Sequence, residues 1–258
     1  MITFPNAKIN IGLQVTERRL DGYHNLDTVF YPIPINDALE VIVAEDADYD
    51  CHLHISGINI EGDIDNNLVV RAYRLLATDY SLPSVDIYLH KHIPTGAGLG
   101  GGSADAGYML CLLNEMFELG LSEQQLAQYA SRLGSDCSFF IYNRPMIGEG
   151  RGEILSEVDF DLPIEGSFDL QVITPAGIAV STKDAYAGIK PHLPATPLRE
   201  ALIKPIEEWS GLLVNDFEET VFSKHPELAA IKRSLYDSGA VYASMSGSGS
   251  ALFAIYRR

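Results

Sequence analysis

Residues 94–106 constrain this chain more than any other stretch, because they read Pro-Thr-Gly-Ala-Gly-Leu-Gly-Gly-Gly-Ser-Ala-Asp-Ala, with five glycines in seven positions. Apolar residues at helical spacing follow over 103–119. A glycine loop that leads into a helix directs unpaired N–H groups and the positive end of the helix dipole at one point, which suits a phosphate. The alternative is a flexible surface loop. Each glycine costs backbone entropy, so the density of glycines favours phosphate binding.

The loop differs from the two best-known nucleotide-binding loops. A Walker A loop ends in Gly-Lys-Ser/Thr, whereas Ser103 and Ala104 follow the last glycine here. Three of the glycines satisfy G-x-G-x-x-G, a pattern that any glycine run can meet by chance. The preceding residues, 85–89, alternate as in a half-exposed antiparallel strand, and no acidic residue stands where a dinucleotide fold places one. The sequence therefore predicts a phosphate site of another kind.

Composition narrows the classes of partner. The chain of 258 residues carries 35 acidic and 18 basic side chains, a formal charge of −17, which argues against nucleic acid or an anionic membrane as a partner. Its N-terminus has no apolar stretch of signal-peptide length, and the sequence has no apolar span of 18 residues, so we expect a soluble, cytoplasmic protein. A phosphate ligand has to enter against this charge. Backbone N–H groups, a few lysines and Mg²⁺ would supply the local attraction.

Hydrophobic periodicity predicts an α+β protein. The predicted strands cover 8–15, 39–44, 85–91, 138–142, 170–174, 241–245 and 251–256, and the predicted helices 67–78, 103–119, 123–133, 181–189, 198–209 and 226–238. We expect Asp65 or Asn66 to cap the first helix, and Ser122 with Gln125 to form a capping box. The glycine- and acid-rich segment 148–166 marks a domain boundary.

Cysteines and histidines do not predict a metal site. The three cysteines have irregular spacing and are expected to be free, buried thiols. His52 and His54 share one face of a strand, as do His90 and His92, and a pair alone leaves a coordination shell incomplete. We therefore expect these four side chains to be solvated and name no metal-binding residue.

Three polar groups could carry chemistry beside the loop. Lys8 stands two residues before Asn10, the turn at 21–25 places a tyrosine next to a histidine, and Asp136 lies in a tight turn before an apolar run. Asp136 is either satisfied by the N–H groups of its own turn or acts as a catalytic base. Phosphoryl transfer needs an anion site, a cation and a carboxylate that accepts a proton. Loop 96–103, Lys8 and Asp136 would supply them, although spacing alone does not place them together.

These residues resemble the GHMP kinases. The resemblance rests on the loop and on four further runs that span nearly the whole chain: 7–11, 18–30, 134–140 and 245–254. It implies an N-terminal α+β domain over 1–150 and a ferredoxin-like C-terminal domain over 151–258. The run Asp-Gly-Tyr-His at 21–24 is similar to that of the members that phosphorylate a cytidine diphosphate-linked methylerythritol with ATP and Mg²⁺ in the non-mevalonate isoprenoid pathway.

The resemblance also implies roles for single residues. Asp136 would be the general base, and Lys8 would steady the transferring phosphoryl group. The implied ATP-binding residues are Lys91, near the adenine, and Pro94, Gly96, Ala97, Gly98, Leu99, Gly100, Gly101, Gly102 and Ser103. The implied substrate-binding residues are Asn10, Tyr23, His24, Tyr186, Gly247, Ser248 and Gly249, with Tyr23 and Tyr186 stacking on the cytosine and His24 bonding to its edge.

One departure from the family pattern concerns the metal. Members often carry two consecutive hydroxyl residues after the glycines, and here the second is Ala104, so Ser103 alone supplies a hydroxyl. Two alternatives stay open at this point: a family kinase that acts on homoserine, mevalonate or a sugar, and a nucleotide-binding homologue without catalysis. We expect a monomer or a weak homodimer.

Overall fold

Two long strands, β2 (Asn6–Arg18) and β3 (His24–Asn36), contribute residues to both of the compact units into which the chain divides. The computed structural model describes residues 1–45, 47–60, 62–158 and 166–258. Unit 1 comprises residues 1–8, 32–95 and 100–144, and unit 2 comprises residues 9–31, 96–99 and 145–258. The units thus interleave along the chain, and the last crossing follows Arg144. The two domains over 1–150 and 151–258 stay a prediction. The glycine loop is itself divided after Leu99.

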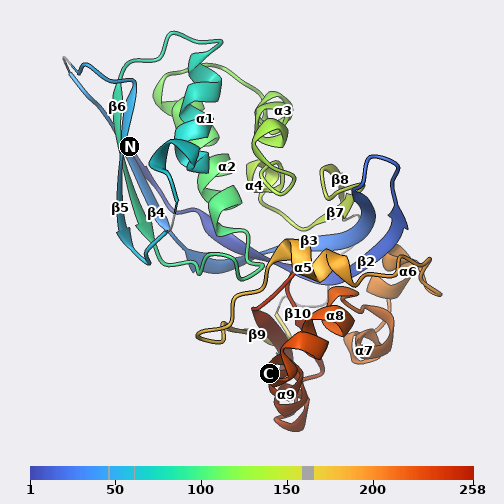
Figure 1. The fold of residues 1–258 in the computed structure, drawn as a ribbon. Helices are drawn as coiled ribbons and strands as arrows, with labels where there is room; N and C mark the ends of the chain where they lie inside the picture. Colours follow the sequence, from blue (N-terminus) through green and yellow to red (C-terminus); the bar gives the residue numbers. More distant parts are fainter. Residues whose placement is uncertain (46, 61, 159–165) are drawn as a thin grey trace. The chain divides into compact units, whose positions relative to one another are not determined.

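Unit 1 is built on a four-stranded sheet, and two helices, α1 (Leu68–Ala77) and α2 (Gly101–Met116), lie side by side over one of its faces (Figure 1). The strand order is β1 (Ile2–Thr3), β4 (Ala38–Val43), β6 (Val85–Lys91) and β5 (Cys51–Gly57). β6 pairs antiparallel with β4 and parallel with the edge strand β5. Its residues alternate as predicted: Val85, Ile87 and Leu89 are buried in the core, and the residues between them face outward.

The helices of unit 1 confirm most of the predicted helical segments. They are α1 (Leu68–Ala77), α2 (Gly101–Met116), α3 (Glu123–Leu133) and α4 (Phe139–Tyr142), with a short 3₁₀ helix η1 (Ile64–Asn66) before α1. The capping box of Ser122 and Gln125 is present. Neither Asp65 nor Asn66 caps α1; Asn67 does, because η1 occupies the two predicted positions.

Residues 138–142 were predicted as a strand, and this prediction was wrong. The apolar run forms the short helix α4 and packs two phenylalanines into the interior of unit 1. A run of only five apolar residues has no periodicity that separates a buried strand from a buried helix. The preceding turn, 134–137, is present as predicted.

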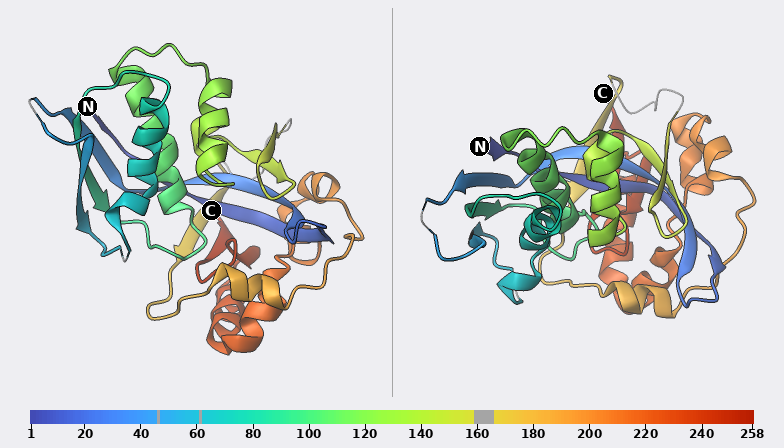
Figure 2. Two further views of the ribbon diagram at one scale, coloured as in Figure 1. Left: turned by 45° about the horizontal axis from the view of Figure 1, so that its top comes forward. Right: turned by 90° about the horizontal axis from the view of Figure 1, so that it is seen from above.

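Unit 2 contains a three-stranded antiparallel sheet, which shares a core with the helices α8 (Phe217–Lys224) and α9 (Pro226–Asp237) (Figure 2). Its strands are β10 (Tyr242–Met245), β11 (Leu252–Arg257) and β9 (Phe168–Ile173), in that order. A second sheet runs in the order β2, β3, β7 (Met146–Glu149) and β8 (Ile154–Glu157). The last two strands fall partly in the predicted boundary segment 148–166, of which residues 159–165 lie outside the described part of the chain.

The helices of unit 2 are shorter than the sequence predicted. They are α5 (Thr182–Ala187), α6 (Leu198–Leu202), the 3₁₀ helix η2 (Ile206–Glu208), α7 (Trp209–Leu212), α8 (Phe217–Lys224) and α9 (Pro226–Asp237). The single helix predicted over 198–209 is broken, because Pro205 lacks the N–H that would continue it. α8 was not predicted, whereas Pro226 opens α9 as expected.

The structure also answers two predictions from composition. All three cysteines are free thiols; Cys137 is buried, while Cys51 and Cys111 are half-buried. None of the helices in the described part of the chain is both long and apolar enough to cross a membrane.

Candidate active site

The glycine loop joins the end of β6 to the first turn of α2, which begins at Gly101, two residues before the predicted start. Gly100 is the N-cap residue and has a φ of +74°. A Cβ on Gly100 would lie 2.9 Å from Phe140 Cζ and 3.0 Å from Lys8 Cε. A Cβ on Gly101 would lie 2.9 Å from Ile93 Cγ2. Packing inside unit 1 therefore accounts for both of these glycines.

Gly102 needs another explanation. It lies in the helix at negative φ, and the nearest described atom to a Cβ there would be Leu68 Cδ1, at 3.8 Å. Gly102 is exposed and lines a cavity of about 270 Å³ in unit 1. Apolar and amide side chains share the lining of this cavity, among them Ile55, Ile60, Ile64, Asn66, Asn67 and Leu68. A cavity next to a helix N-terminus offers a place for a nucleotide.

Lys91 also lines this cavity, but its ammonium group is already engaged. It is 1% exposed and contacts the carboxylates of Asp37 and, at 2.6 Å, Asp105. The other oxygen of Asp37 accepts hydrogen bonds from the backbone N–H groups of His92 and Ile93. This buried network ties the strand before the loop to the helix after it.

Asp105 is the unusual member of that network. Its Oδ1 atom is buried and has no hydrogen-bond partner among the described residues. Burial, followed by the charge of Asp37, raises the pKa of Asp105 to about 7, although the Lys91 ammonium opposes the shift. Asp105 therefore titrates close to neutral pH.

Lys8 and Asp136 come together, as phosphoryl transfer requires. Lys8 Nζ lies 3.3 Å from Asp136 Oδ2, and the lysine is buried while the side chain of the aspartate is 33% exposed. The lysine stem runs against Gly100, where only a glycine leaves room for it. The arrangement places a cation and an accessible carboxylate beside the start of α2. The half-buried Ser103 lies in the first turn of this helix.

In unit 2, the first part of the loop packs against the turn at 246–250. A Cβ on Gly98 would lie 2.0 Å from the carbonyl oxygen of Ser246, so this position also requires glycine. Ser246 Oγ donates to the carbonyl of Gly98 at 2.9 Å, and the N–H of Ala251 donates to the carbonyl of Ala97 at 3.0 Å. The resemblance implies that loop and turn belong to one site; in the structure they are in direct contact, and their shared role stays a prediction.

The same turn adjoins Asn10. The backbone N–H of Asn10 donates to Ser246 Oγ at 3.2 Å, and its Nδ2 donates to Thr28 Oγ1 at 3.1 Å. Asn10 is 2% exposed, and its Oδ1 would lie 3.3 Å from a Cβ on Gly247. Asn10 thus borders the predicted substrate-binding glycines as a buried residue. A direct contact between it and a substrate stays a prediction.

The aromatic residues predicted to hold a base lie in unit 2 as well. The ring of His24 stacks on that of Tyr186, with centroids 5.0 Å apart and planes 20° apart. Burial, followed by the charge of Arg18, lowers the pKa of His24, which favours the neutral imidazole. Tyr23 is 56% exposed, and the guanidinium of Arg151 lies over its ring, 5.0 Å from the ring centroid. The structure brings Tyr186 to His24; that Tyr23 and Tyr186 enclose a base stays a prediction.

The remaining predicted residues lie along these segments. Pro94 is half-buried, Gly96 is exposed at a φ of +69°, and Leu99 is buried. Ser248 Oγ lies 3.1 Å from Thr182 Oγ1, at the start of α5. Gly249 is buried, and its N–H donates to the carbonyl of Ser246.

Sequence reasoning missed three residues that hold these segments in place. Asp37 and Asp105 fix the loop from unit 1, and Asn215 Nδ2 donates to the carbonyls of Met245 and Gly247 in unit 2. Asp105 lies four residues after Gly101, where α2 begins, so its closeness to the glycine run could have indicated it. Asp37 and Asn215 stand far from any motif, so nothing local in the sequence indicates them.

Comparisons with known proteins bear on this geometry. The family described as the GHMP kinases N terminal domain matches residues 67–144, and that described as GHMP kinases C terminal matches residues 198–258. The chain belongs to the GHMP kinase family. Its resemblance to these kinases, read from the loop and the flanking runs, is thereby confirmed, as is the α+β fold.

Two similar relatives carry the same name. A 4-diphosphocytidyl-2-C-methyl-D-erythritol kinase of Bacteroides fragilis is 54% identical over 99% of this chain and 92% of its own length. One of Solidesulfovibrio magneticus is 39% identical over 98% of this chain and 87% of its own. A crystal structure of 4-(cytidine 5'-diphospho)-2C-methyl-D-erythritol kinase has a TM-score of 0.81 at 33% identity, over 98% of this chain and 89% of that one.

A more distant structure shows the shared fold alone. Homoserine kinase from Cytophaga hutchinsonii has a TM-score of 0.67 at 18% identity, over 98% of this chain and 85% of its own.

Proposed function

We propose that this protein transfers the γ-phosphoryl group of ATP to the 2-hydroxyl of 4-diphosphocytidyl-2-C-methyl-D-erythritol, a step of the non-mevalonate isoprenoid pathway. Relatives that are 39–54% identical carry the name of this kinase. The observation that carries the proposal is the pair of Lys8 and Asp136, 3.3 Å apart beside the start of α2. It combines the two side chains that phosphoryl transfer to an alcohol requires.

Asp136 accepts the proton of the acceptor hydroxyl as that oxygen attacks the γ-phosphorus. Its carboxylate is partly exposed and hence accessible to a bound alcohol. Lys8 keeps the carboxylate in place and offers positive charge to the oxygens of the transferring group. Since Lys8 is buried, it loses little side-chain entropy when the substrates bind.

ATP binds along the glycine loop, with its phosphates at the N-terminus of α2. The exposed Gly102 leaves space for a phosphate, and the cavity lined by Ile55, Ile60 and Leu68 has room for the adenine. Lys91 contributes a wall of that cavity. Direct contact of its ammonium with the base would compete with Asp37 and Asp105.

Mg²⁺ is the metal that ATP-dependent kinases use, and the oxygen donors here suit it. Mg²⁺ keeps several waters and takes one or two protein oxygens besides the phosphates. The half-buried Ser103 and the partly exposed Asp136 are such donors, whereas the methyl side chain of Ala104 has no ligand atom. Bound Mg²⁺ would neutralise negative charge on the phosphates. Ser103 is thus the hydroxyl that we assign to it.

The cytidine end of the acceptor binds in unit 2. Neutral His24 can hydrogen-bond to the edge of the cytosine, with its ring held by Tyr186. Tyr23 is exposed and can stack on the base. Asn10 and the glycine turn Gly247–Gly249 complete this part, next to Gly98.

The test measures ADP release with ATP, Mg²⁺ and 4-diphosphocytidyl-2-C-methyl-D-erythritol, with homoserine, mevalonate and galactose as parallel acceptors. We expect turnover with the cytidine compound alone. Asp136→Asn should keep ATP affinity and lose at least ~100-fold in kcat, the scale of a general base. Asp237→Asn makes the same change at an exposed position of α9 and should not alter kcat. Equal kcat in both variants would remove Asp136 from the mechanism.

The panel also decides between the alternatives. Turnover with another acceptor would mean that the Tyr-His turn does not recognise cytosine, and ATP binding without ADP release would indicate a non-catalytic homologue. We further propose that the enzyme acts in the cytoplasm as a monomer or weak homodimer, without nucleic acid or membrane partners. Size-exclusion chromatography with light scattering measures the oligomeric state.

A further inference from the structure

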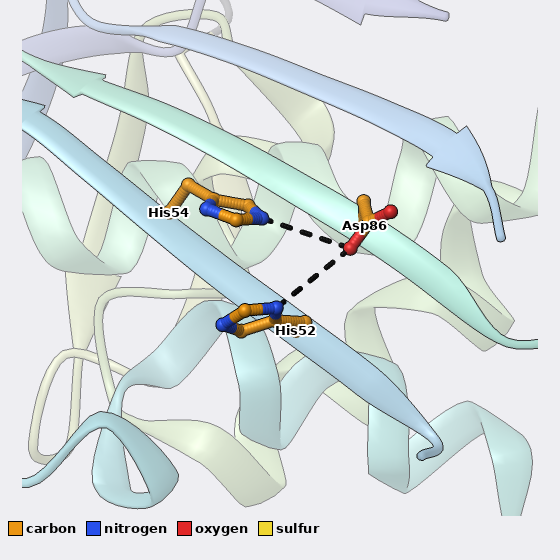
Figure 3. A group of neighbouring side chains, drawn as sticks. All are labelled: His52, His54 and Asp86. Carbon is orange, nitrogen blue, oxygen red and sulfur yellow. Dashed lines mark ion pairs between the residues drawn. The ribbon is translucent and has the colours of Figure 1, made fainter. Parts of the chain in front are cut away.

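Two histidines and an aspartate gather on the outer face of the unit 1 sheet, away from the residues assigned to the kinase reaction. Figure 3 shows His52 and His54, from the edge strand β5, directed toward Asp86 of β6. Leu53, between the histidines, is buried in the core, so the strand alternation places both imidazoles on the opposite face. His52 and Asp86 are direct partners in the parallel register of the two strands.

The three side chains converge on one point. Asp86 Oδ1 lies 3.9 Å from His52 Nδ1 and 3.7 Å from His54 Nε2, and all three ligand atoms lie within 4.8 Å of one another. Ligands of a tetrahedral ion with bonds of about 2.0–2.1 Å stand about 3.3 Å apart. The imidazoles are exposed and can rotate, so small changes in side-chain torsion close the difference.

Two neighbouring tyrosines contact the three side chains of this cluster. Tyr49 Oη donates a hydrogen bond of 2.9 Å to Asp86 Oδ1, and the Tyr49 ring meets His52 edge-on at 5.7 Å. His54 stacks on Tyr88, with ring centroids 4.6 Å apart and planes 9° apart. Partners of this kind orient the ligands of metal sites and account for a large share of their affinity.

We propose that His52, His54 and Asp86 form a binding site for a divalent transition-metal ion of the Zn²⁺ class, with water in the remaining coordination position. Two imidazole nitrogens and one carboxylate oxygen are a donor set that Zn²⁺ prefers, whereas Mg²⁺ prefers oxygen alone. The charge of −17 attracts cations to the chain. The bound ion cross-links the edge strand β5 to β6. This site is independent of the proposed kinase activity.

The pair of histidines alone did not predict this site, because a third ligand was needed. β6 supplies it through the parallel register that places Asp86 opposite His52. His90 lies on the same strand as Asp86 and instead contacts Ser56 Oγ through Nδ1, at 2.9 Å. His90 is therefore a matched control: an exposed histidine on the same sheet, outside the cluster.

The experiment titrates the metal-free, full-length protein with Zn²⁺ by calorimetry and with Co²⁺ by visible absorption, and records the Tm with and without Zn²⁺. We expect saturation at one equivalent per chain and a higher Tm with Zn²⁺, since an ion that binds only the folded state stabilises it. His54→Ala and Asp86→Asn should each weaken Zn²⁺ binding at least about 10-fold, and Tyr49→Phe about 10-fold. His90→Ala should bind Zn²⁺ as the parent protein does.

Two results would overturn the proposal. One is equal Zn²⁺ affinity in His54→Ala and the parent protein; the other is an equal loss in His54→Ala and His90→Ala, which would indicate general binding to surface imidazoles. The Tm of each metal-free variant shows whether the fold is intact. ADP release at saturating Mg²⁺ is expected to be the same in His54→Ala as in the parent, so failure of the metal proposal and of the kinase proposal are distinguishable.

Discussion

At the scale of single residues, Gly102 allows a test between two reasons why a loop is rich in glycine. One is close packing of the backbone, and the other is access for a ligand. Its neighbours leave room for a methyl group and its φ is ordinary. Gly102→Ala should therefore stabilise the fold by about 0.5–1 kcal/mol, because alanine is the better helix former. If phosphates bind there, the same methyl group should raise the KM for ATP at least about 10-fold. Thermal unfolding and initial rates measure the two effects.

Gly211→Ala is the matched control for Gly102→Ala. Gly211 lies in α7, and no described atom would come within 4 Å of a Cβ there. This variant should gain comparable stability and keep the KM for ATP. If Gly102→Ala also keeps its KM, the phosphates do not lie against the first turn of α2.

The ionisation of Asp105 should make the free energy of unfolding depend on pH. Its pKa is raised from 3.8 to about 7 in the folded protein, chiefly by burial. Between these values the folded state binds a proton that the unfolded state has released, so this contribution to stability is lost as the pH rises from about 4 through about 7. The substitution Asp105→Asn removes this titratable group. From pH 5 to 8, the parent protein should lose more than about 1 kcal/mol of unfolding free energy relative to this variant in denaturant titrations. A constant difference would contradict the raised pKa.

The two residues that we propose for the reaction were easier to predict from the sequence than the residues that support them. Lys8 and Asp136 each stand within a recognisable run, and the resemblance to a family assigned them to one reaction. Asp37 and Asn215 act through long-range contacts to backbone groups of the loop and the turn. Such contacts follow from the packed fold, and no local pattern in the sequence records them.

At the scale of elements, the turn between β2 and β3 should decide which acceptor is used. Tyr23 lies in this turn, is exposed, and has little part in the core. Stacking of a base on an aromatic ring is worth about 1–3 kcal/mol. Tyr23→Ala should therefore raise the KM for the cytidine acceptor about 10-fold and leave the KM for ATP unchanged. Leu20→Ala, at a fully exposed position nearby, should change neither constant.

An unchanged acceptor KM in Tyr23→Ala would point to a small acceptor without a base. A change in both KM values would instead indicate a general effect of the turn on the fold, which the Tm would reveal. Stacking on cytosine is supported only if the KM for the acceptor rises while the KM for ATP is unchanged.

Periodicity predicted long elements well and short ones poorly. α3 and its capping box lie where expected, because eleven residues give a clear helical repeat and Ser122 with Gln125 marks the start. α4 has four residues, too few for a repeat, and was predicted as a strand. In the segment after Leu198, the apolar pattern continues through Pro205 although the helix cannot.

At the scale of the whole molecule, the interleaving of the two units was beyond sequence analysis. A boundary was expected where composition changes, near 148–166. The chain enters unit 2 at Ile9, inside the continuous strand β2, and again for four residues of the glycine loop. Composition does not change at Ile9, and the second crossing lies inside the glycine run. The chain crosses into unit 2 once more after Arg144, close to the expected boundary. Pairing between residues distant in sequence sets these limits, and local patterns do not report it.

Net charge leads to a prediction for substrate capture. The chain carries −17, and ATP is an anion, so the average field opposes their encounter. Added salt shortens the Debye length from about 30 Å at 0.01 M to about 10 Å at 0.1 M and screens this repulsion. The kcat/KM for ATP should rise about 2-fold or more over that range at constant free Mg²⁺, with little change in kcat.

The alternative outcome is a kcat/KM for ATP that falls as salt is added. Lys8 and the N-terminus of α2 provide positive potential close to the loop, and salt would screen that attraction as well. A fall in kcat/KM with salt would mean that this local field outweighs the net charge. Potassium chloride and potassium acetate at equal ionic strength should give the same slope, since screening depends on ionic strength; a difference between them would reveal anion binding at the phosphate site instead.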